Sequence, residues 1–504
     1  MKTDQSRPRD IRVDPCFIRF DPCTMYGMKP STRLLIFIIL LAVLLRVGVA
    51  LYLGDTTPPG KDESSYSLLA ARLASGHGYS FADWHYPFTP SEMPTAHWSF
   101  LYTALVAAIY TGAGVHPLAV RLVQAVLTGL LMPWLTWRLA RRAGSGHWAL
   151  GSGQWAVGSR HLPISNLQSP ISHSPISQSP NLLTSLPLLA ALLAAFYAYF
   201  VLYGAMTQTE GLFLLAVVWS LERALAVQEK LAIGNWRLGD WGVVVMLGVS
   251  VAVATLLRQS ILPWVAVMLV WLLAADGVAQ RRVRGRTLAA LAVVGAILLA
   301  AVLPFTLRNY RVYGELLLLN SNAGYAMYSA QHPLHRVSFD AYAAAPLPGD
   351  LTPPPANEAQ WDRALMARGV QFVLDDPGRY LLLSASRAVD YFEFWPKTSS
   401  SLLFNVGRMA SFTLLLPFMV YGVWMVGRGT SLFSPPVFLL LFVLVYSLLH
   451  IFTWAMPRYR LPVDAVLLIF AAAGLSDLVR RTPWIRRRWD ADQNGLDTDY
   501  HGFL

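Results

Sequence analysis

Charged residues are scarce in this chain of 504 residues. Only 14% of them are Asp, Glu, Lys or Arg and 55% are hydrophobic, whereas a soluble domain has about 25% charged residues. So few charges do not suit a soluble core with this much apolar sequence. The composition therefore excludes an ordinary soluble domain and predicts a multi-pass helical membrane protein.

Cysteine is nearly absent. The chain has two cysteines, Cys16 and Cys23, and both precede the first long apolar run. They are too few for a disulfide framework and have no His or Cys partners at metal-ligand spacing. No other cluster has such spacing, so no cofactor is predicted. A divalent ion is compatible with the sequence but not indicated by it.

Basic residues outnumber acidic ones, and the formal net charge is +11. In a membrane protein such an excess gathers on cytoplasmic loops. No basic face with interleaved aromatics lies outside the membrane flanks, so the predicted partner is the lipid bilayer and not nucleic acid. The basic N-terminus precedes a run of full span length without a small-residue cleavage site. We therefore expect a retained first helix and not a cleaved signal peptide.

Long apolar runs predict an all-α, polytopic protein with about ten or eleven transmembrane helices. The ten predicted spans are 33–53, 118–137, 186–206, 211–227, 241–257, 261–275, 288–306, 408–427, 433–453 and 461–478. A shorter run, 99–113, is interpreted as a re-entrant or interfacial helix on the outer side, and whether it spans the membrane stays open.

Clusters of arginine set the orientation. Three basic clusters follow predicted spans: Arg138, Arg141 and Arg142; Arg281, Arg282, Arg284 and Arg286; Arg480, Arg481, Arg486, Arg487 and Arg488. If all three clusters are cytoplasmic, the ten spans alternate consistently and both termini are cytoplasmic. The signals fit a bacterial inner membrane, with the opposite face periplasmic or external.

These spans divide the chain into five parts. They are a cytoplasmic tail, 1–32; a transmembrane core, 33–306, with a first outer loop 54–117 and a cytoplasmic loop 143–185; a large outer loop, 307–405; C-terminal transmembrane helices, 406–478; and a basic cytoplasmic tail, 479–504.

Two loops carry further signals. The loop 143–185 repeats Pro-Ile-Ser, a low-complexity pattern for which we expect disorder and no role in the chemistry. In the large outer loop, Asp376-Pro377 predicts the start of an interfacial helix, and the stretch 358–374 also has helical periodicity.

An acid pair, Asp62-Glu63, opens the stretch DESSYSLLAARLASGHGY in the first outer loop. One interpretation is a helix start, since Asp is a good N-cap and acidic residues suit the positive end of a helix dipole. Gly76 and Gly78 would then end this helix. The other interpretation is a catalytic site, and the residues alone leave both open.

Further polar residues stand at the outer ends of spans. Glu210 begins one span in TQTEGLF, where an acid between two apolar runs is costly and usually functional or paired. The arginines at outer span ends are Arg258, Arg308, Arg311, Arg458 and Arg460. Each arginine alone is also explained as an interfacial anchor. Together, carboxylates and guanidinium groups suit displacement of a phosphate leaving group, because a carboxylate can accept a proton and arginine can hold phosphate.

Several segments together resemble the C-type membrane glycosyltransferases (GT-C fold). They are KDESSYSLLAARLASGHGY, PTAHWSFLY, RLVQAVLTGLLMPWLTWRLARR, TQTEGLF, LRNYRVYG and PRYRLP. The chain is most similar to the branch with the lipid A aminoarabinose transferase and is also similar to protein O-mannosyltransferases. The resemblance covers roughly 33–478 without the loop 143–185.

The resemblance implies a polyprenyl-phosphate sugar as donor and inverting transfer on the outer face of the cell membrane. It implies that Asp62, with Glu63 beside it, is the catalytic or acceptor-orienting carboxylate, and that Glu210 is a second acid of the site. The aminoarabinose branch has aspartate at the position of Glu210. It also has a Lys-Pro pair that meets the donor phosphate, where this chain has Ala96-His97-Trp98.

His97 is therefore a candidate substitute for that lysine, or else a surface or aromatic-stacked histidine. Phosphate contact then falls to Arg258, Arg308, Arg458 or Arg460, and the sequence does not decide which. Arg46, within the first span, is expected either to snorkel outward or to pair with an acid of the site.

The predicted function is thus an integral membrane glycosyltransferase of the cell envelope that uses a lipid-linked sugar and a lipid, glycan or protein acceptor. A transporter or flippase of lipid-linked sugars is one alternative, although it predicts internal repeats and mid-membrane polar residues. A non-catalytic scaffold and an O-antigen ligase-type enzyme are the others. The sugar, the acceptor and the oligomeric state are not readable from the sequence.

Overall fold

The computed structural model describes residues 29–144, 182, 185–233, 237–396, 401–427 and 430–482. These residues form helices and two isolated β-bridges, Ser80–Pro94 and His85–Thr89, and contain no β-strand. Cys16, Cys23, almost all of the loop 143–185 and most of the basic tail lie outside the described residues, so the expectations for them stay predictions.

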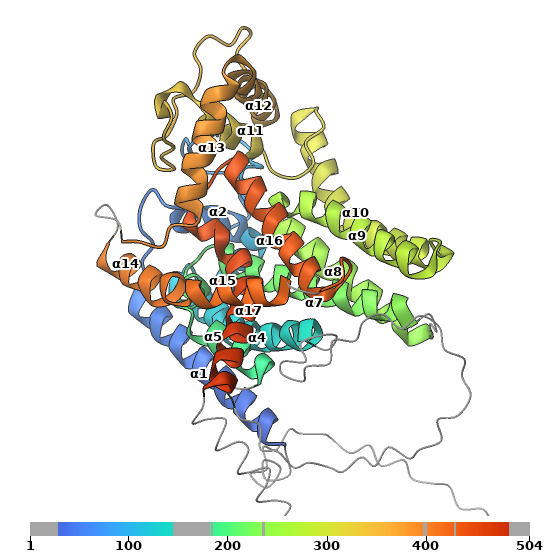
Figure 1. Ribbon diagram of the computed structural model, residues 1–504. Helices are drawn as coiled ribbons and strands as arrows, with labels where there is room; N and C mark the ends of the chain where they lie inside the picture. Colours follow the sequence, from blue (N-terminus) through green and yellow to red (C-terminus); the bar gives the residue numbers. More distant parts are fainter. Residues whose placement is uncertain are drawn as a thin grey trace, which may run out of the picture.

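The helices fall into a bundle and an outer group (Figure 1). The helices of the bundle are α1 (Pro30–Leu53), α4 (Pro117–Gly144), α5 (Leu186–Phe196), α6 (Ala198–Ala205), α7 (Glu210–Ile233), α8 (Trp241–Leu257), α9 (Leu262–Gln280), α10 (Gly285–Tyr313), α14 (Leu402–Arg408), α15 (Leu414–Gly427), α16 (Pro435–Phe452) and α17 (Leu461–Arg481). The remaining α-helices of the described residues are α2 (Asp62–Ala74), α3 (Phe100–Ala113), α11 (Ala323–Gln331), α12 (Glu358–Asp375) and α13 (Pro377–Tyr391).

Seven of the described helical segments are long and apolar enough to cross a membrane, and the bent pair α5–α6 would make an eighth. Two other predicted spans, 211–227 and 241–257, are helical as α7 and α8 but are not among these. The run 99–113 is the short apolar helix α3. The predicted all-α, polytopic class is thus confirmed, and every predicted span falls on helix, with 186–206 divided between α5 and α6.

α17 forms the centre of the bundle, where 78% of its most apolar stretch is buried. It packs against α15, α5, α16 and α7 (Figure 1). The contact with α15 is close, because a Cβ on Gly422 would lie 1.9 Å from the carbonyl oxygen of Phe470. Small residues permit such backbone approach between membrane helices.

Arg46 stabilises a break that the sequence did not predict. The predicted span 186–206 is bent by 55° between α5 and α6, at Tyr197. The fully buried Arg46 donates hydrogen bonds to the carbonyl oxygens of Ala194 and Ala195, 3.2 and 3.1 Å away, and so satisfies backbone groups beside the break. Both expectations for Arg46 were therefore wrong: it does not snorkel, and its described partners are backbone carbonyls and not an acid.

The outer group of helices α11, α12 and α13 lies at the top of Figure 1. α13 begins where predicted, since Asp376 caps it by accepting from the backbone N–H of Arg379 at 2.9 Å. α12 covers the predicted helical stretch 358–374 and carries the buried Glu358. The carboxylate of Glu358 accepts from the backbone N–H of Ala96 at 2.7 Å and from the Ser321 hydroxyl at 2.9 Å. It therefore joins the first outer segment to the second.

Two of the basic clusters meet at one end of α7. Arg142 Nη1 contacts Glu229, and Arg284 donates to the carbonyl oxygen of Leu231. Glu210 lies at the other end of the same helix. These arginines and Glu210 therefore lie apart along α7, while the membrane face of each stays a prediction.

Candidate active site

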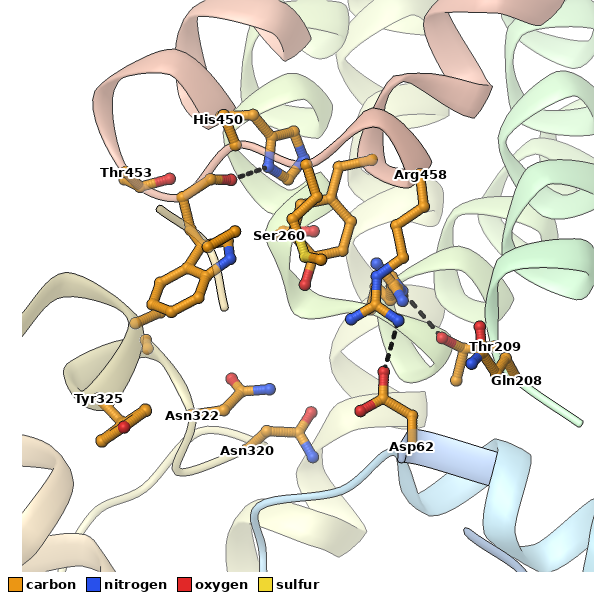
Figure 2. Close-up of a pocket in the computed structure, with 18 of the residues that line it drawn as sticks. Asp62, Gln208, Thr209, Ser260, Asn320, Asn322, Tyr325, His450, Thr453 and Arg458 are labelled. Carbon is orange, nitrogen blue, oxygen red and sulfur yellow. Dashed lines mark hydrogen bonds and ion pairs between the residues drawn. The ribbon is translucent and has the colours of Figure 1, made fainter. Parts of the chain in front are cut away.

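A cavity of ≈ 2200 Å³ lies between the bundle and the outer segments. Its wall is formed by the start of α2, the turn between α8 and α9, the turn between α16 and α17, and residues 316–344 of the outer region. Figure 2 shows Asp62 pointing at the guanidinium of Arg458, with Asn320 and Asn322 on the neighbouring wall. The outer ends of several spans therefore meet at one cavity.

Two acids and two arginines form a continuous charged cluster at this cavity. Asp62 Oδ2 lies 2.7 Å from Arg458 Nη1, and Arg458 Nε lies 3.5 Å from Glu210 Oε1. Arg258 Nη2 contacts the same Glu210 oxygen at 2.6 Å. Arg258 Nε also donates to the Thr209 hydroxyl at 2.9 Å. Four of the residues singled out in the sequence are thus brought together.

All four charged residues of the cluster stand at or next to the ends of helices. Asp62 is the first residue of α2 and Lys61 is its N-cap, so Asp62 is not the cap itself. Glu210 is the first residue of α7, where a carboxylate suits the positive end of the helix. Arg258 stands in the extended residue between α8 and a short 3₁₀ turn, and Arg458 stands in the 3₁₀ turn Pro457–Arg460. Each side chain comes from a helix boundary.

The electrostatics favour an ionised Asp62. Burial alone raises the pKa of Asp62, but the nearby charges of Arg458 and Arg258 lower it by more, so this pKa lies below its usual value. Each guanidinium keeps N–H groups for which the described residues show no partner, Nη1 of Arg258 and Nη2 of Arg458. The cluster can accept a proton at one oxygen and bind an anion at two arginines.

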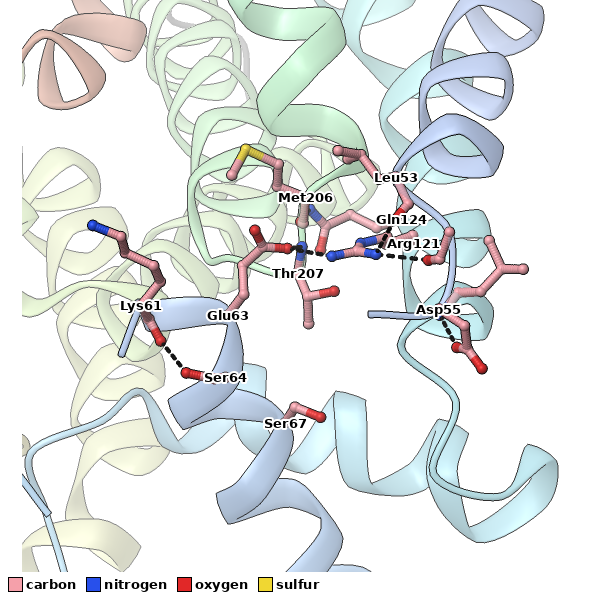
Figure 3. Close-up of polar contacts among 12 residues, drawn as sticks. Leu53, Asp55, Lys61, Glu63, Ser64, Ser67, Arg121, Gln124, Met206 and Thr207 are labelled. Atoms are coloured by element: carbon pink, nitrogen blue, oxygen red, sulfur yellow. Dashed lines mark hydrogen bonds and ion pairs between the residues drawn. The ribbon is translucent and has the colours of Figure 1, made fainter. Parts of the chain in front are cut away.

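Glu63 points at Arg121 and at the backbone of Thr207 (Figure 3). Its carboxylate contacts Arg121 Nη2 at 2.9 Å and accepts from the backbone N–H of Thr207 at 3.1 Å. Arg121 also donates to the carbonyl oxygens of Leu53 and Gly54, at the end of α1. Both of these contacts are made by Oε2 of Glu63, so this carboxylate fixes the start of α2 against α1, α4 and the segment before α7.

His97 lines the cavity, and its buried Nδ1 has no hydrogen-bond partner in the described part of the chain. Its ring lies edge-on to the rings of Phe88 and Trp98, with centroids 5.7 and 5.5 Å away. Burial lowers the pKa of His97, which favours the neutral ring. The ring is thus packed edge-on among aromatic rings, and a neutral imidazole does not replace the charge of a lysine. Substrate binding by His97 stays a prediction.

Two predicted arginines are not brought to the cavity. Arg460 is fully buried, contacts Asp464 at 2.8 Å and donates to the carbonyl oxygen of Tyr391 at 2.7 Å. Arg308 lies over three rings, with centroid distances of 5.7 Å to Tyr79, 5.4 Å to Phe100 and 5.9 Å to Tyr313. The substrate-binding prediction for both is corrected: packing and internal pairing occupy these side chains.

Several polar residues of the cavity wall were missed by sequence reasoning. They are Gln208, Thr209, Gln259, Ser260, Asn320, Asn322, Tyr325, His450 and Thr453. Gln259 Nε2 donates to Asn322 Oδ1 at 3.1 Å, so two carboxamides from separate segments meet at the wall. Six of them stand within a few residues of a predicted span end, close to residues that were selected for their charge. Asn320, Asn322 and Tyr325 lie in the outer segment after α10 and carry no such signal.

No group of three or more His, Cys, Asp or Glu side chains suited to a metal occurs among the residues that the structure describes. The candidate site is therefore built from paired charges and carboxamides.

No protein-family model matches this sequence, and no curated protein matches it. Solved structures do. The apo crystal structure of the oligosaccharyltransferase from Archaeoglobus fulgidus aligns with a TM-score of 0.55 and 13% identity, over 93% of this chain and 52% of that one. The same protein tethered to an acceptor peptide containing the NVT sequon aligns with a TM-score of 0.53 and 13% identity, over 91% and 50%.

The chain has the fold of a C-type membrane glycosyltransferase. It spans about half the length of the oligosaccharyltransferase, so the similarity shows the fold and does not by itself show an activity. The predicted GT-C fold is confirmed.

Proposed function

We propose that this protein is an integral membrane glycosyltransferase that moves a sugar from a polyprenyl phosphate to a hydroxyl group of a lipid, glycan or protein acceptor. The observation that carries the proposal is the cluster in which Asp62 faces Arg458 and Arg258 in one cavity at the ends of membrane helices. A base and two anion-binding groups are what displacement of a phosphate requires. The C-type fold supports the same reaction class.

The donor phosphate binds between Arg258 and Arg458. Their side chains are 20% and 18% exposed, and each retains N–H groups without a described protein partner. A guanidinium pairs well with phosphate oxygens because its donors form a planar fork. Leu257, Leu262 and Leu316 line the same cavity and offer an apolar path for the lipid chain.

Asp62 accepts the proton of the acceptor hydroxyl. The acceptor oxygen attacks the anomeric carbon as the carbon–oxygen bond to phosphate breaks, and the polyprenyl phosphate leaves with that electron pair. Attack from the side opposite to the phosphate inverts the anomeric centre. When Arg458 pairs with a bound phosphate, its ion pair with Asp62 weakens. The pKa of Asp62 then rises, and the carboxylate becomes a stronger base.

The other predicted acids have supporting roles. Glu210 holds Arg258 and Arg458 in place through its Oε1 atom. Glu63 positions α2 through Arg121. His97, as a buried neutral ring, shapes the wall beside Asp62. The remaining parts of the prediction stand as proposals: a bacterial inner membrane location, cytoplasmic termini and a site on the periplasmic or external face.

The test is release of free polyprenyl phosphate from a panel of polyprenyl-phosphate sugars. Purified protein in proteoliposomes receives each donor and a membrane extract as acceptor source, and the products are identified by mass spectrometry. We expect release with one sugar and a loss of at least about a hundredfold in Asp62→Asn, the scale of general-base catalysis. Asp55→Asn is the matched control, since Asp55 is an exposed acid near the end of α1 that pairs with His116.

Equal release by wild type and Asp62→Asn would remove Asp62 from the mechanism and return it to a helix start. No release with any donor, from protein shown to be folded, would favour a transporter or flippase of lipid-linked sugars. Transfer of a preassembled glycan with no transfer from any single-sugar donor would favour an O-antigen ligase-type enzyme.

A further inference from the structure

Arg458 occupies the space between two carboxylates. Its Nη1 lies 2.7 Å from Asp62 Oδ2 and its Nε lies 3.5 Å from Glu210 Oε1. Sites that handle phosphate esters often place a divalent ion in such a position, held by one or two carboxylates and by the phosphate itself. Here a guanidinium takes that position.

A divalent ion does not fit this arrangement of side chains. The oxygens that Asp62 and Glu210 turn toward each other already contact nitrogens of Arg458, and Glu210 Oε1 also contacts Arg258 at 2.6 Å. A metal bound to these oxygens would lie within a few ångströms of two guanidinium groups. Repulsion between like charges is strong where water is scarce, and Glu210 is only 3% exposed.

We propose that Arg458 is a built-in cation, so that glycosyl transfer needs no divalent metal. The same geometry implies that removing its guanidinium converts Asp62 and Glu210 into a site for a divalent cation. The statement about transfer rests on the proposed function, whereas the statement about metal binding rests on geometry and charge alone.

Charge balance supports the expectation that the protein without Arg458 binds a divalent cation. Two carboxylates and two guanidinium groups make the cluster neutral as it stands. Without Arg458, Asp62 loses its ion-pair partner, and the cluster becomes negative by one unit beside the buried Glu210. Asp62 then has two oxygens available, with the Thr209 hydroxyl 3.4 Å from Glu210 Oε2 as a further oxygen nearby. Carboxylate and hydroxyl oxygens are the ligands that Mn²⁺ and Mg²⁺ prefer.

The first experiment measures binding of Mn²⁺ alone, without donor. Metal-stripped protein in detergent is titrated with Mn²⁺, and free Mn²⁺ is followed by electron paramagnetic resonance. We expect Arg458→Ala to bind one Mn²⁺ at least about tenfold more tightly than wild type, a difference of about 1.4 kcal/mol. The double variant Arg458→Ala/Asp62→Asn should lose that gain. Arg308→Ala, which removes an arginine outside the cavity, should behave as wild type.

Wild-type protein that binds Mn²⁺ as tightly as Arg458→Ala overturns the proposal. So does an Arg458→Ala protein that shows no gain. Arg458→Gln provides a second variant with a similar side-chain length, and size-exclusion chromatography with thermal unfolding establishes that each variant is folded.

The second experiment measures transfer in the presence of EDTA. Wild-type transfer should be unchanged, and a loss that Mn²⁺ restores would overturn the claim that Arg458 replaces a metal. If wild type transfers no sugar from any donor, the proposed function fails, and the Mn²⁺ titration still decides whether Arg458 excludes a metal from the acid pair.

Discussion

The carboxylate of Glu63 lies 2.9 Å from the guanidinium of Arg121, and both side chains are almost completely buried. Successive residues of a helix point about 100° apart, so this ion pair directs the neighbouring Asp62 toward the cavity. The acid pair at the start of α2 therefore places Glu63 in a buried ion pair and Asp62 at the cavity beside Arg458. The catalytic interpretation of Asp62 stays a proposal.

Glu63→Gln should destabilise the protein, because it leaves the buried Arg121 without its charge partner. Removing one member of a buried ion pair costs about 3–5 kcal/mol in the free energy of unfolding. Thermal unfolding in detergent, followed by tryptophan fluorescence, measures the loss. Glu63→Gln/Arg121→Gln is the control and should recover part of the stability. A single variant as stable as wild type would contradict the structural role of Glu63.

Arg458→Gln should move the acidic limb of the transfer rate to higher pH. Asp62 acts as a base only when deprotonated, and burial raises its pKa while Arg458 and Arg258 lower it by more. Wild type should therefore keep its activity down to about pH 4, near the ordinary pKa of aspartate. Without Arg458 the pKa rises, so activity should decline at higher pH than in wild type. The measurement is kcat/KM between pH 4 and 8, normalised to each maximum. Superimposable profiles would show that Arg458 does not tune Asp62.

Arg258→Gln should weaken donor binding. A hydrogen bond to a charged group contributes about 1.5–3 kcal/mol, which corresponds to an increase of about 10- to 150-fold in the KM for the donor. Arg308→Gln is the matched control, because Arg308 is enclosed by Tyr79, Phe100 and Tyr313 and does not line the cavity. Equal effects of both substitutions would argue against a phosphate site at Arg258.

Asp362→Asn should make the protein more stable above neutral pH. Burial raises the pKa of Asp362 to about 6, while its hydrogen bond from the Gly324 N–H acts in the opposite direction. The folded state therefore binds this proton more tightly than the unfolded chain does. The resulting stability is present below about pH 4, the unfolded pKa, and is lost as the pH rises through about 6.

The asparagine keeps the acceptor for Gly324 and has no charge to bury. Thermal unfolding at pH 5 and 7.5 should show a smaller decline for Asp362→Asn than for wild type. Asp350→Asn is the control, since Asp350 pairs with Arg368 and has a lowered pKa. An unchanged decline in Asp362→Asn would exclude this carboxyl as the cause.

Much of the fold was readable from the sequence because its signals are local. The predicted span 241–257 coincides with α8, and the predicted cap at Asp376 forms as expected. Long apolar runs and turn residues determine such elements within a few residues of chain. The cavity residues Asp62, Glu210, Arg258 and Arg458 were also found, because a charge at the end of an apolar run stands out.

The remaining features depend on distant parts of the chain. The break at Tyr197 is stabilised by Arg46, about 150 positions away, and no local pattern predicts it. Arg258 and Arg308 both stand at the outer end of a predicted span. Arg258 nevertheless lines the cavity, whereas Arg308 lies over aromatic rings. The direction of a side chain at a helix end is determined by tertiary packing, which apolar periodicity does not record.

Glu358 couples the two outer segments to each other. Its single carboxylate receives hydrogen bonds from Thr89, Ala96 and Ser321, so the two outer segments depend on one side chain although about 260 residues of sequence separate Ala96 from it. Backbone amides in both segments should exchange with solvent through one common opening, with similar protection. The outer segment 316–344, which lines the cavity, should then open or stay closed together with the first outer segment, so access to the cavity from this side depends on one buried carboxylate.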